Sequence, residues 1–174
     1  MDLKNPAGPY QAPENYDPNL VQSQSREIQG FPELLNRTLD GLNDAQISTK
    51  TLPGNWTVAQ VVHHLADSHM NALIRLKLAL TMDNPSIMPY PEWLWADLAD
   101  GHLPDISPSL DILKGVHARF HLVLDDLDEE AAHKTYYHSE LKRKVPVFEI
   151  PALYSWHGKH HLAHIDLLKK DRGW

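Results

Sequence analysis

Apolar side chains recur at three- and four-residue steps in several separate stretches of this chain. In residues 19–42 the repeating positions are Ile28, Phe31, Leu35, Leu39 and Leu42. This spacing places them on one face of a helix, so we predict a first helix over 19–42. Pro32 interrupts the stretch, and we expect it to kink the helix or to begin its second half.

The second predicted helix has a clear start. Thr57 and Gln60 have the spacing of a capping box, in which each side chain bonds to the backbone amide of the other residue. Trp56 precedes the cap and Val61 follows at the position where a hydrophobic staple forms. The apolar pattern continues from there, so we predict that this helix runs to about Thr81.

The rest of the chain predicts two more helices and a long crossover. Residues 83–106 contain four prolines and form the crossover, and a third helix begins at Ser107-Pro108, with Ser107 as its cap. Residues 145–148 predict a short strand or an extended link, and a fourth helix runs from near Pro151 to near Lys170. With an extended arm over 1–18, the chain is predicted to be one all-α domain, 1–174, folded as a four-helix bundle with a long crossover between helices 2 and 3.

Composition narrows the classes of partner. The net charge of -7, without a basic run, argues against a nucleic-acid or anionic-membrane partner, so we expect a small-molecule substrate. The chain has no cysteine, which excludes disulfides and thiolate metal ligands. The first residues carry no apolar signal segment and no apolar run is as long as a membrane span, so we expect a cytoplasmic protein.

Histidines gather in two of the predicted helices. The fourth helix has four within eight residues, at His157, His160, His161 and His164, and the second helix has three, at His63, His64 and His69. Neutral imidazole is the commonest side-chain metal ligand, and two histidines one helical turn apart can share an ion. The two clusters therefore indicate a metal held between helices.

A helical wheel ranks these histidines by the face they occupy. In the fourth helix it places Ser155 on the wet side, His164 near the middle of the buried side and His161 toward the rim, so the pair His160/His164 points inward better than His157/His161. In the second helix it places His69 on the apolar face and His64 on the polar edge. From the wheel alone, His69 would be the inward group, although a bundle helix can bury two faces.

Two segments resemble the metal-binding helices of the YfiT-like proteins in the DinB superfamily. The first runs from Gly54-Asn55-Trp56 to Asn71 and the second from Tyr154 to Ile165. The resemblance implies a DinB-like four-helix bundle in which three histidines hold one divalent ion, zinc or nickel. It implies that His64, His160 and His164 are the ligands. His69, His157 and His161 would then be neighbours of the ligands or core side chains.

Three neutral histidines with an open position are typical of a catalytic metal site. The family resemblance implies a metal-dependent hydrolase in which the ion activates water. The alternatives are a metal-dependent S-transferase that activates a low-molecular-weight thiol of the bacillithiol type, and a non-catalytic metal- or ligand-binding bundle. Glu92 and Glu149 are the carboxylates nearest the two motifs, but nothing in the sequence assigns either as a general base.

Other polar and aromatic residues are expected to have structural roles. His117 and His121 lie four apart in the third helix without a matching motif, so we interpret them as ordinary polar positions without a metal. Asp67 is expected to be a solvated helix charge, and Trp93 to pack over the end of the bundle. Exposed apolar groups in the crossover favour a homodimer.

Overall fold

Four long helices dominate the computed structural model, which describes residues 4–52 and 56–174. They are α1 (Pro18–Leu39), α3 (Val58–Thr81), α5 (Ser107–Asp125) and α7 (Glu149–Arg172). The first three residues of the predicted arm, and Gly54 and Asn55 of the first motif, lie outside the described residues. The prediction of a four-helix bundle is confirmed.

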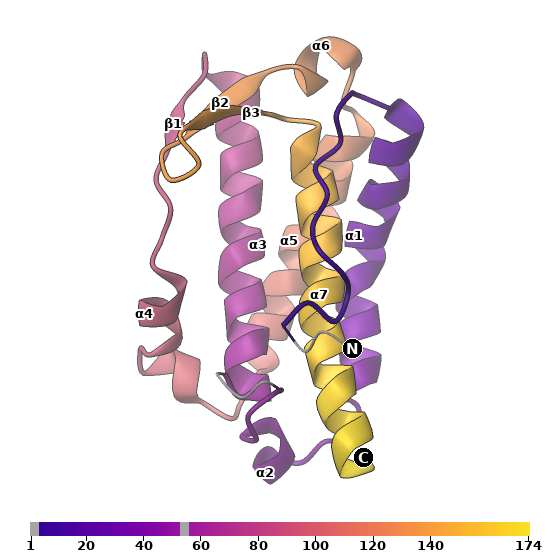
Figure 1. The fold of residues 1–174 in the computed structure, drawn as a ribbon, viewed down its shortest axis with the longest axis vertical. Coiled ribbons are helices and arrows are strands. Elements are labelled where there is room, and N and C mark those ends of the chain that lie inside the picture. Colours follow the sequence, from indigo (N-terminus) through magenta and orange to yellow (C-terminus); the bar gives the residue numbers. More distant parts are fainter. Residues whose placement is uncertain (1–3, 53–55) are drawn as a thin grey trace.

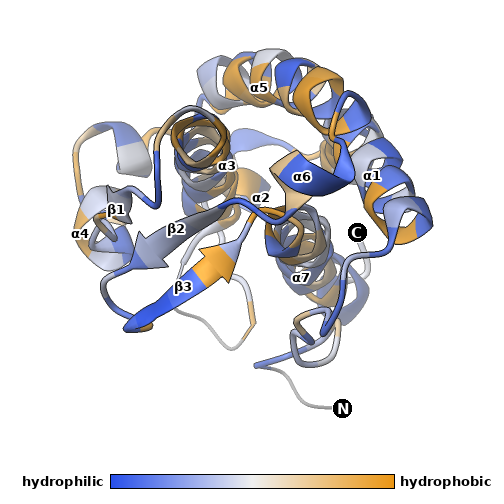
Figure 2. Cartoon of the chain, turned by 90° about the horizontal axis from the view of Figure 1, so that it is seen from above, coloured by the Kyte–Doolittle hydropathy of each residue, from blue (hydrophilic) through white to orange (hydrophobic). Residues whose placement is uncertain are grey.

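The order of the helices around the bundle explains the long crossover. Helix α1 packs beside α5 and α7, and α3 packs beside the same two helices, so α1 and α3 lie diagonally opposite each other (Figures 1 and 2). Helices α3 and α5 run in the same direction along the bundle (Figure 1). The segment between them must therefore travel back along its length, and it carries the short α4 (Glu92–Ala96) and a 3₁₀ turn, η1 (Asp100–His102).

A small three-stranded sheet closes one end of the bundle (Figure 1). Strand β1 (Ser86–Ile87) pairs in parallel with β2 (Thr135–His138), which pairs antiparallel with β3 (Arg143–Pro146). The sequence predicted only an extended segment near β3, because strands of two to four residues are too short to show an alternating pattern. Two short helices, α2 (Asp44–Ile47) and α6 (Glu129–Ala132), complete the connections.

The ends of the long helices show which local predictions were correct. The capping box at Thr57 and Gln60 is formed in both directions, at 3.0 and 3.1 Å, and α3 ends at Thr81 as predicted. The cap predicted at Ser107 is wrong. Ser107 is the first residue of α5, and its amide and hydroxyl both donate to the carboxylate of Asp105.

Helix α7 is buried on more than one side. The wheel placed Ser155 on the wet side, but Ser155 is buried and its hydroxyl donates to the Glu27 carboxylate of α1. The reason is that α7 packs against both α1 and α3, while Gly8 of the N-terminal arm accepts a bond from Trp156. Among the described residues, none of the helices combines the length and the apolar character that a membrane span requires.

Candidate metal centre

Helices α3 and α7 bring three histidines together inside the bundle. His64 comes from α3, and His157 and His161 come from consecutive turns of α7. Each offers a ring nitrogen within 4.8 Å of the others. The ring centroids of His64 and His161 are 4.9 Å apart, and those of His157 and His161 are 4.6 Å apart. These three side chains form what we call the histidine triad.

The spacing within the triad suits a metal ion. The Nε2 atoms of His64 and His157 are 3.2 Å apart. A tetrahedral zinc ion binds imidazole nitrogen at about 2.0–2.1 Å, which separates two ligand atoms by about 3.3–3.4 Å. In addition, Nδ1 of His161, like Nδ1 of His160 outside the triad, is buried without a hydrogen-bond partner within the described residues. Because an unpaired buried polar atom is costly, this nitrogen leaves the ring in need of a ligand.

Burial keeps the triad neutral. It lowers the pKa of His64 to about 4. Burial also lowers the pKa values of His157 and His161 well below the ordinary range, and the neighbouring imidazoles lower them further. A metal ligand must be the neutral imidazole, so all three rings are ready to bind a cation at neutral pH.

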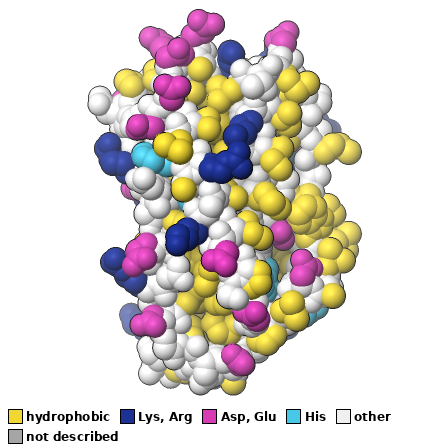
Figure 3. Space-filling model, turned by 180° about the vertical axis from the view of Figure 1, so that it is seen from behind, with side chains coloured by type: hydrophobic (Ala, Val, Ile, Leu, Met, Phe, Trp, Pro, Cys, Tyr) yellow, Lys and Arg dark blue, Asp and Glu magenta, His cyan; other side chains and the backbone are white. Residues whose placement is uncertain are grey.

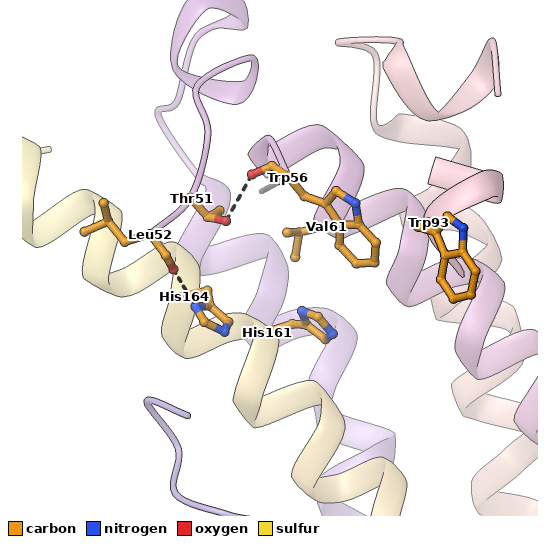
Figure 4. A pocket seen from close by; sticks show the side chains of 7 residues that line it. All are labelled: Thr51, Leu52, Trp56, Val61, Trp93, His161 and His164. Atoms are coloured by element: carbon orange, nitrogen blue, oxygen red, sulfur yellow. Dashed lines mark hydrogen bonds between the residues drawn. The ribbon is translucent and has the colours of Figure 1, made fainter. Parts of the chain in front are cut away.

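Two cavities of different character adjoin the triad. The first, of about 400 Å³, is mostly apolar and is lined by His161, His164, Trp56, Val61 and Trp93, among others (Figure 4). The second, of about 190 Å³, is lined by His157 together with polar side chains, including Arg75, Tyr90, Glu92 and Tyr154. A small molecule could therefore approach the triad from either cavity.

The structure pairs His160 and His164 with each other. Their Nε2 atoms are 3.3 Å apart, and Nδ1 of His164 donates to the carbonyl of Leu52 (Figure 4). Of the three ligands predicted from the sequence, only His64 belongs to the triad. The other two members of the triad are His157 and His161. The two pairs share the same four-residue spacing and differ by about 60° around the helix, since each residue advances it by about 100°.

The remaining histidines near the triad are also placed by the structure. His69 is fully buried, as the wheel predicted, and its Nε2 lies 3.0 Å from Nδ1 of His157. His64, which the wheel placed on a polar edge, is buried as well, because α3 packs against both α5 and α7. The interpretation of His117 as an ordinary polar position is wrong, since it is buried and its Nε2 lies 2.8 Å from Nδ1 of His69.

The two carboxylates nearest the motifs have different surroundings. Glu149 forms a two-bond ion pair with Arg143, at 2.7 and 2.9 Å. Glu92 lines the polar cavity that His157 also lines, and its pKa is raised by burial and by Glu140. Asp67 is half-buried, and burial together with the neighbouring Asp100 raises the pKa of its carboxyl group. Of these three carboxylates, Glu92 shares a cavity with the triad, and Glu140 lines the same cavity.

The comparisons with known proteins define the family. The DinB superfamily model matches residues 27–165, and the chain belongs to this superfamily. It is 42% identical over 99% of its length, and 97% of the relative, to the "Putative metal-dependent hydrolase GK0616" of Geobacillus kaustophilus. It is 37% identical to the "Putative metal-dependent hydrolase YfiT" of Bacillus subtilis, over 100% of this chain and 98% of that one.

Solved structures show the same fold. The structure of YfiT from Bacillus subtilis, described as a probable metal-dependent hydrolase with an unusual four-helix bundle topology, superimposes with a TM-score of 0.96 over 100% of this chain and 99% of that one. A mycothiol-dependent maleylpyruvate isomerase matches with a TM-score of 0.68 over 86% of this chain and 61% of that one. At 17% identity, this second match shows a shared fold.

Proposed function

We propose that this protein is a metal-dependent hydrolase whose divalent ion, zinc or nickel, is held by His64, His157 and His161. The observation that carries the proposal is the convergence of three neutral imidazoles from two helices, with cavities beside them. The sequence-based set, His64 with His160 and His164, stays a prediction that the same experiments test. An ion with three histidine ligands and an open position supplies Lewis acidity that lowers the pKa of water to about 7.

The protein's own side chains would bind the substrate and exclude water. Trp56 packs against His64 with ring centroids 4.7 Å apart, and with Trp93 it lines the apolar cavity, where it would hold an apolar group of the substrate. On the polar side, the Tyr90 hydroxyl lies 3.5 Å from Nδ1 of His64. Burial and Glu92 raise the pKa of Tyr90, so its hydroxyl stays protonated and could donate to a substrate oxygen.

A thiol S-transferase is the second candidate. The two cavities beside the triad favour it, since a transfer reaction must bind two molecules at one centre. The apolar cavity would hold the electrophile and the polar cavity a low-molecular-weight thiol. The sulfur would form a bond to the electrophilic carbon, and the leaving group would depart with the proton of the thiol. Neutral imidazole ligands leave the ion its full positive charge, which stabilises a thiolate.

Turnover assays separate these functions. Metal-loaded protein would be tested on nitrophenyl esters and on an aryl halide, each with and without a low-molecular-weight thiol. Ester turnover without thiol supports the hydrolase, and turnover of the aryl halide only with thiol supports the transferase. In either case His157→Ala should abolish turnover. Metal uptake without turnover on either substrate would contradict both proposals and favour a non-catalytic binding bundle.

We also propose that the crossover contacts a second copy of this chain. Hydrophobic side chains gather along the edge of the molecule on which the crossover lies (Figure 3). The crossover leaves large apolar side chains more than half exposed, at Met88, Trp93, Leu94, Leu98 and Leu103. Covering such a surface is favourable, and a homodimer is the commonest way to do so. Sedimentation of the wild type and of Leu94→Lys tests this, because the variant should be monomeric.

A further inference from the structure

A line of hydrogen bonds connects all four long helices to the triad. It begins at the carbonyl of Ile28 in α1, which accepts from Nδ1 of His117 in α5. Nε2 of His117 lies 2.8 Å from Nδ1 of His69 in α3. Nε2 of His69 lies 3.0 Å from Nδ1 of His157 in α7. We call these three rings, His117, His69 and His157, the imidazole line.

Pro32 explains why the line can begin at Ile28. In a helix the carbonyl of residue 28 accepts from the amide of residue 32, but proline has no amide hydrogen. Pro32 lies inside α1, so the Ile28 carbonyl is free to accept from another group. A buried carbonyl needs such a partner, and His117 provides it.

The chemistry of imidazole then fixes every proton in the line. A carbonyl oxygen can only accept, so His117 carries its hydrogen on Nδ1. A neutral imidazole has one donor and one acceptor nitrogen, so Nε2 of His117 accepts. His69 must therefore donate from Nδ1 and accept at Nε2. By the same step, His157 donates from Nδ1, and its Nε2 keeps a lone pair.

Nε2 of His157 is the atom that faces His64, at 3.2 Å. We propose that His117 and His69 are positioning residues, which hold His157 in the tautomer whose Nε2 lone pair points into the triad. The tautomer of His157 is set by hydrogen bonds within the protein and does not depend on a bound metal. Its value for metal binding rests on the proposed function, in which His157 is a ligand.

Packing fixes the orientation of these rings. The rings of His69 and His117 lie edge to edge in nearly parallel planes, 10° apart with centroids 4.7 Å apart, as a hydrogen bond in the ring plane requires. Phe31 of α1 stacks on both, with centroid distances of 5.8 and 5.5 Å. His69 is 0% exposed and His117 is 1% exposed, so neither can exchange its partners for water. Reversing the line would leave the Ile28 carbonyl without a donor, which costs free energy in a buried site.

Substitution of His117 tests the imidazole line at a residue that is two hydrogen bonds away from His157 of the triad. Phenylalanine keeps a flat ring for stacking but removes both hydrogen-bonding atoms. Glutamine can donate to Ile28 through its amide nitrogen and accept from His69 through its amide oxygen, so it preserves the direction of the line. His121→Phe is the matched control, because His121 lies one turn further along α5 and bonds to Ser25 instead.

The first measurement is nitrogen-15 NMR of the metal-free protein at neutral pH, with the His157 signals assigned by comparison with His157→Asn. In the wild type, in His117→Gln and in His121→Phe, we expect the hydrogen of His157 on Nδ1. In His117→Phe we expect a substantial population with the hydrogen on Nε2. Melting curves of each variant verify that it is folded. A wild-type His157 protonated on Nε2 would overturn the proposal.

The second measurement is the dissociation constant for zinc in the same four proteins. Loss of a group that orients a metal-bound histidine typically weakens binding by about 10–100-fold, so we expect that loss in His117→Phe and recovery in His117→Gln. A folded His117→Phe protein with wild-type tautomer and affinity would refute the positioning role. If the tautomers are as expected but the wild type takes up no metal, the proposed function fails while the imidazole line stands.

Discussion

Nε2 of His64 and Nε2 of His157 lie 3.2 Å apart, although 93 positions separate the two residues in the sequence. Two neutral imidazoles at this distance can share one hydrogen, or both can direct lone pairs at one cation. The imidazole line places the hydrogen of His157 on Nδ1. That nitrogen then donates to His69, and Nε2 of His157 is left to face His64. The pair is therefore held by a contact on each side, from His69 to His157 and from Tyr90 to His64.

Alanine variants will decide between the two sets of ligands. His157→Ala and His161→Ala should purify without metal, because each removes one nitrogen of the triad. His160→Ala should keep about one ion per chain, since a three-histidine site stays complete. Elemental analysis of the purified proteins measures this directly. Loss of metal in His160→Ala with retention in His157→Ala would support the ligands predicted from the sequence.

Gly158 is a position in α7 where an added methyl group has no room. A Cβ added there would lie 2.8 Å from the ring of Phe31. Phe31 must then move, and it is the ring that stacks on His69 and His117. We expect Gly158→Ala to lower the free energy of unfolding by about 1–3 kcal/mol, as overpacked cores do. It should also weaken zinc binding, because the imidazole line loses its support.

Gly115→Ala provides the control for this variant. Gly115 lies inside α5, and a Cβ there would meet nothing within 4 Å. Alanine is favoured over glycine in a helix interior, so the free energy of unfolding of this variant should rise by about 0.5–1 kcal/mol. Urea denaturation of both variants and of the wild type measures the two changes in the free energy of unfolding. Equal effects from the two substitutions would contradict the role assigned to the contact between Gly158 and Phe31.

Local signals in the sequence were sufficient for most of the helical fold. The capping box at Thr57 and Gln60 depends on residues three positions apart, so it could be recognised without the structure. The prediction of a helix cap at Ser107 was wrong because the hydroxyl of Ser107 donates to the carboxylate of Asp105, two residues earlier. A wheel could not show this competition, nor that Ser155 meets Glu27 of another helix.

The site was harder to predict than the fold. His157 and His160 lie only about 60° apart on the helix surface, and which of them meets His64 depends on how α7 is rotated against α3. That rotation is set by contacts distant in sequence, such as Phe31 against Gly158. His117 bonds to residues 48 and 89 positions away, so its spacing from His121 carried no information about its partners.

Buried neutral histidines should make the metal-free protein less stable in acid. Burial lowers the pKa of His117 to about 4, against 6.5 in the unfolded chain. Between these values the unfolded chain binds a proton that the native state does not, so stability falls as pH decreases from 6.5 to 4. The slope from one such group is about 1.4 kcal/mol per pH unit. Above pH 6.5 His117 is neutral in both the native and the unfolded state, so its contribution to the free energy of unfolding is fully present and no longer changes with pH.

Urea denaturation across this pH range measures the effect. The slope of the free energy of unfolding against pH should be steeper in the wild type than in His117→Phe. The difference should be about the contribution of one histidine. The variant can be less stable overall, because it leaves the Ile28 carbonyl without its donor, but this offset does not change with pH. Parallel curves for the two proteins would show that His117 is already protonated in the native state.

Metal binding should release few protons, even in mild acid. At pH 6, three histidines with ordinary pKa values near 6.5 would carry about two protons in total, and these would be lost when a cation binds. The pKa of His64 is lowered to about 4, and those of His157 and His161 are well below the usual range. The triad therefore has almost no protons to release. Titration calorimetry at pH 6, in two buffers of different ionisation enthalpy, gives the number directly. A release of two protons per ion would mean that the triad is open to water before the metal binds, and that the site forms only with it.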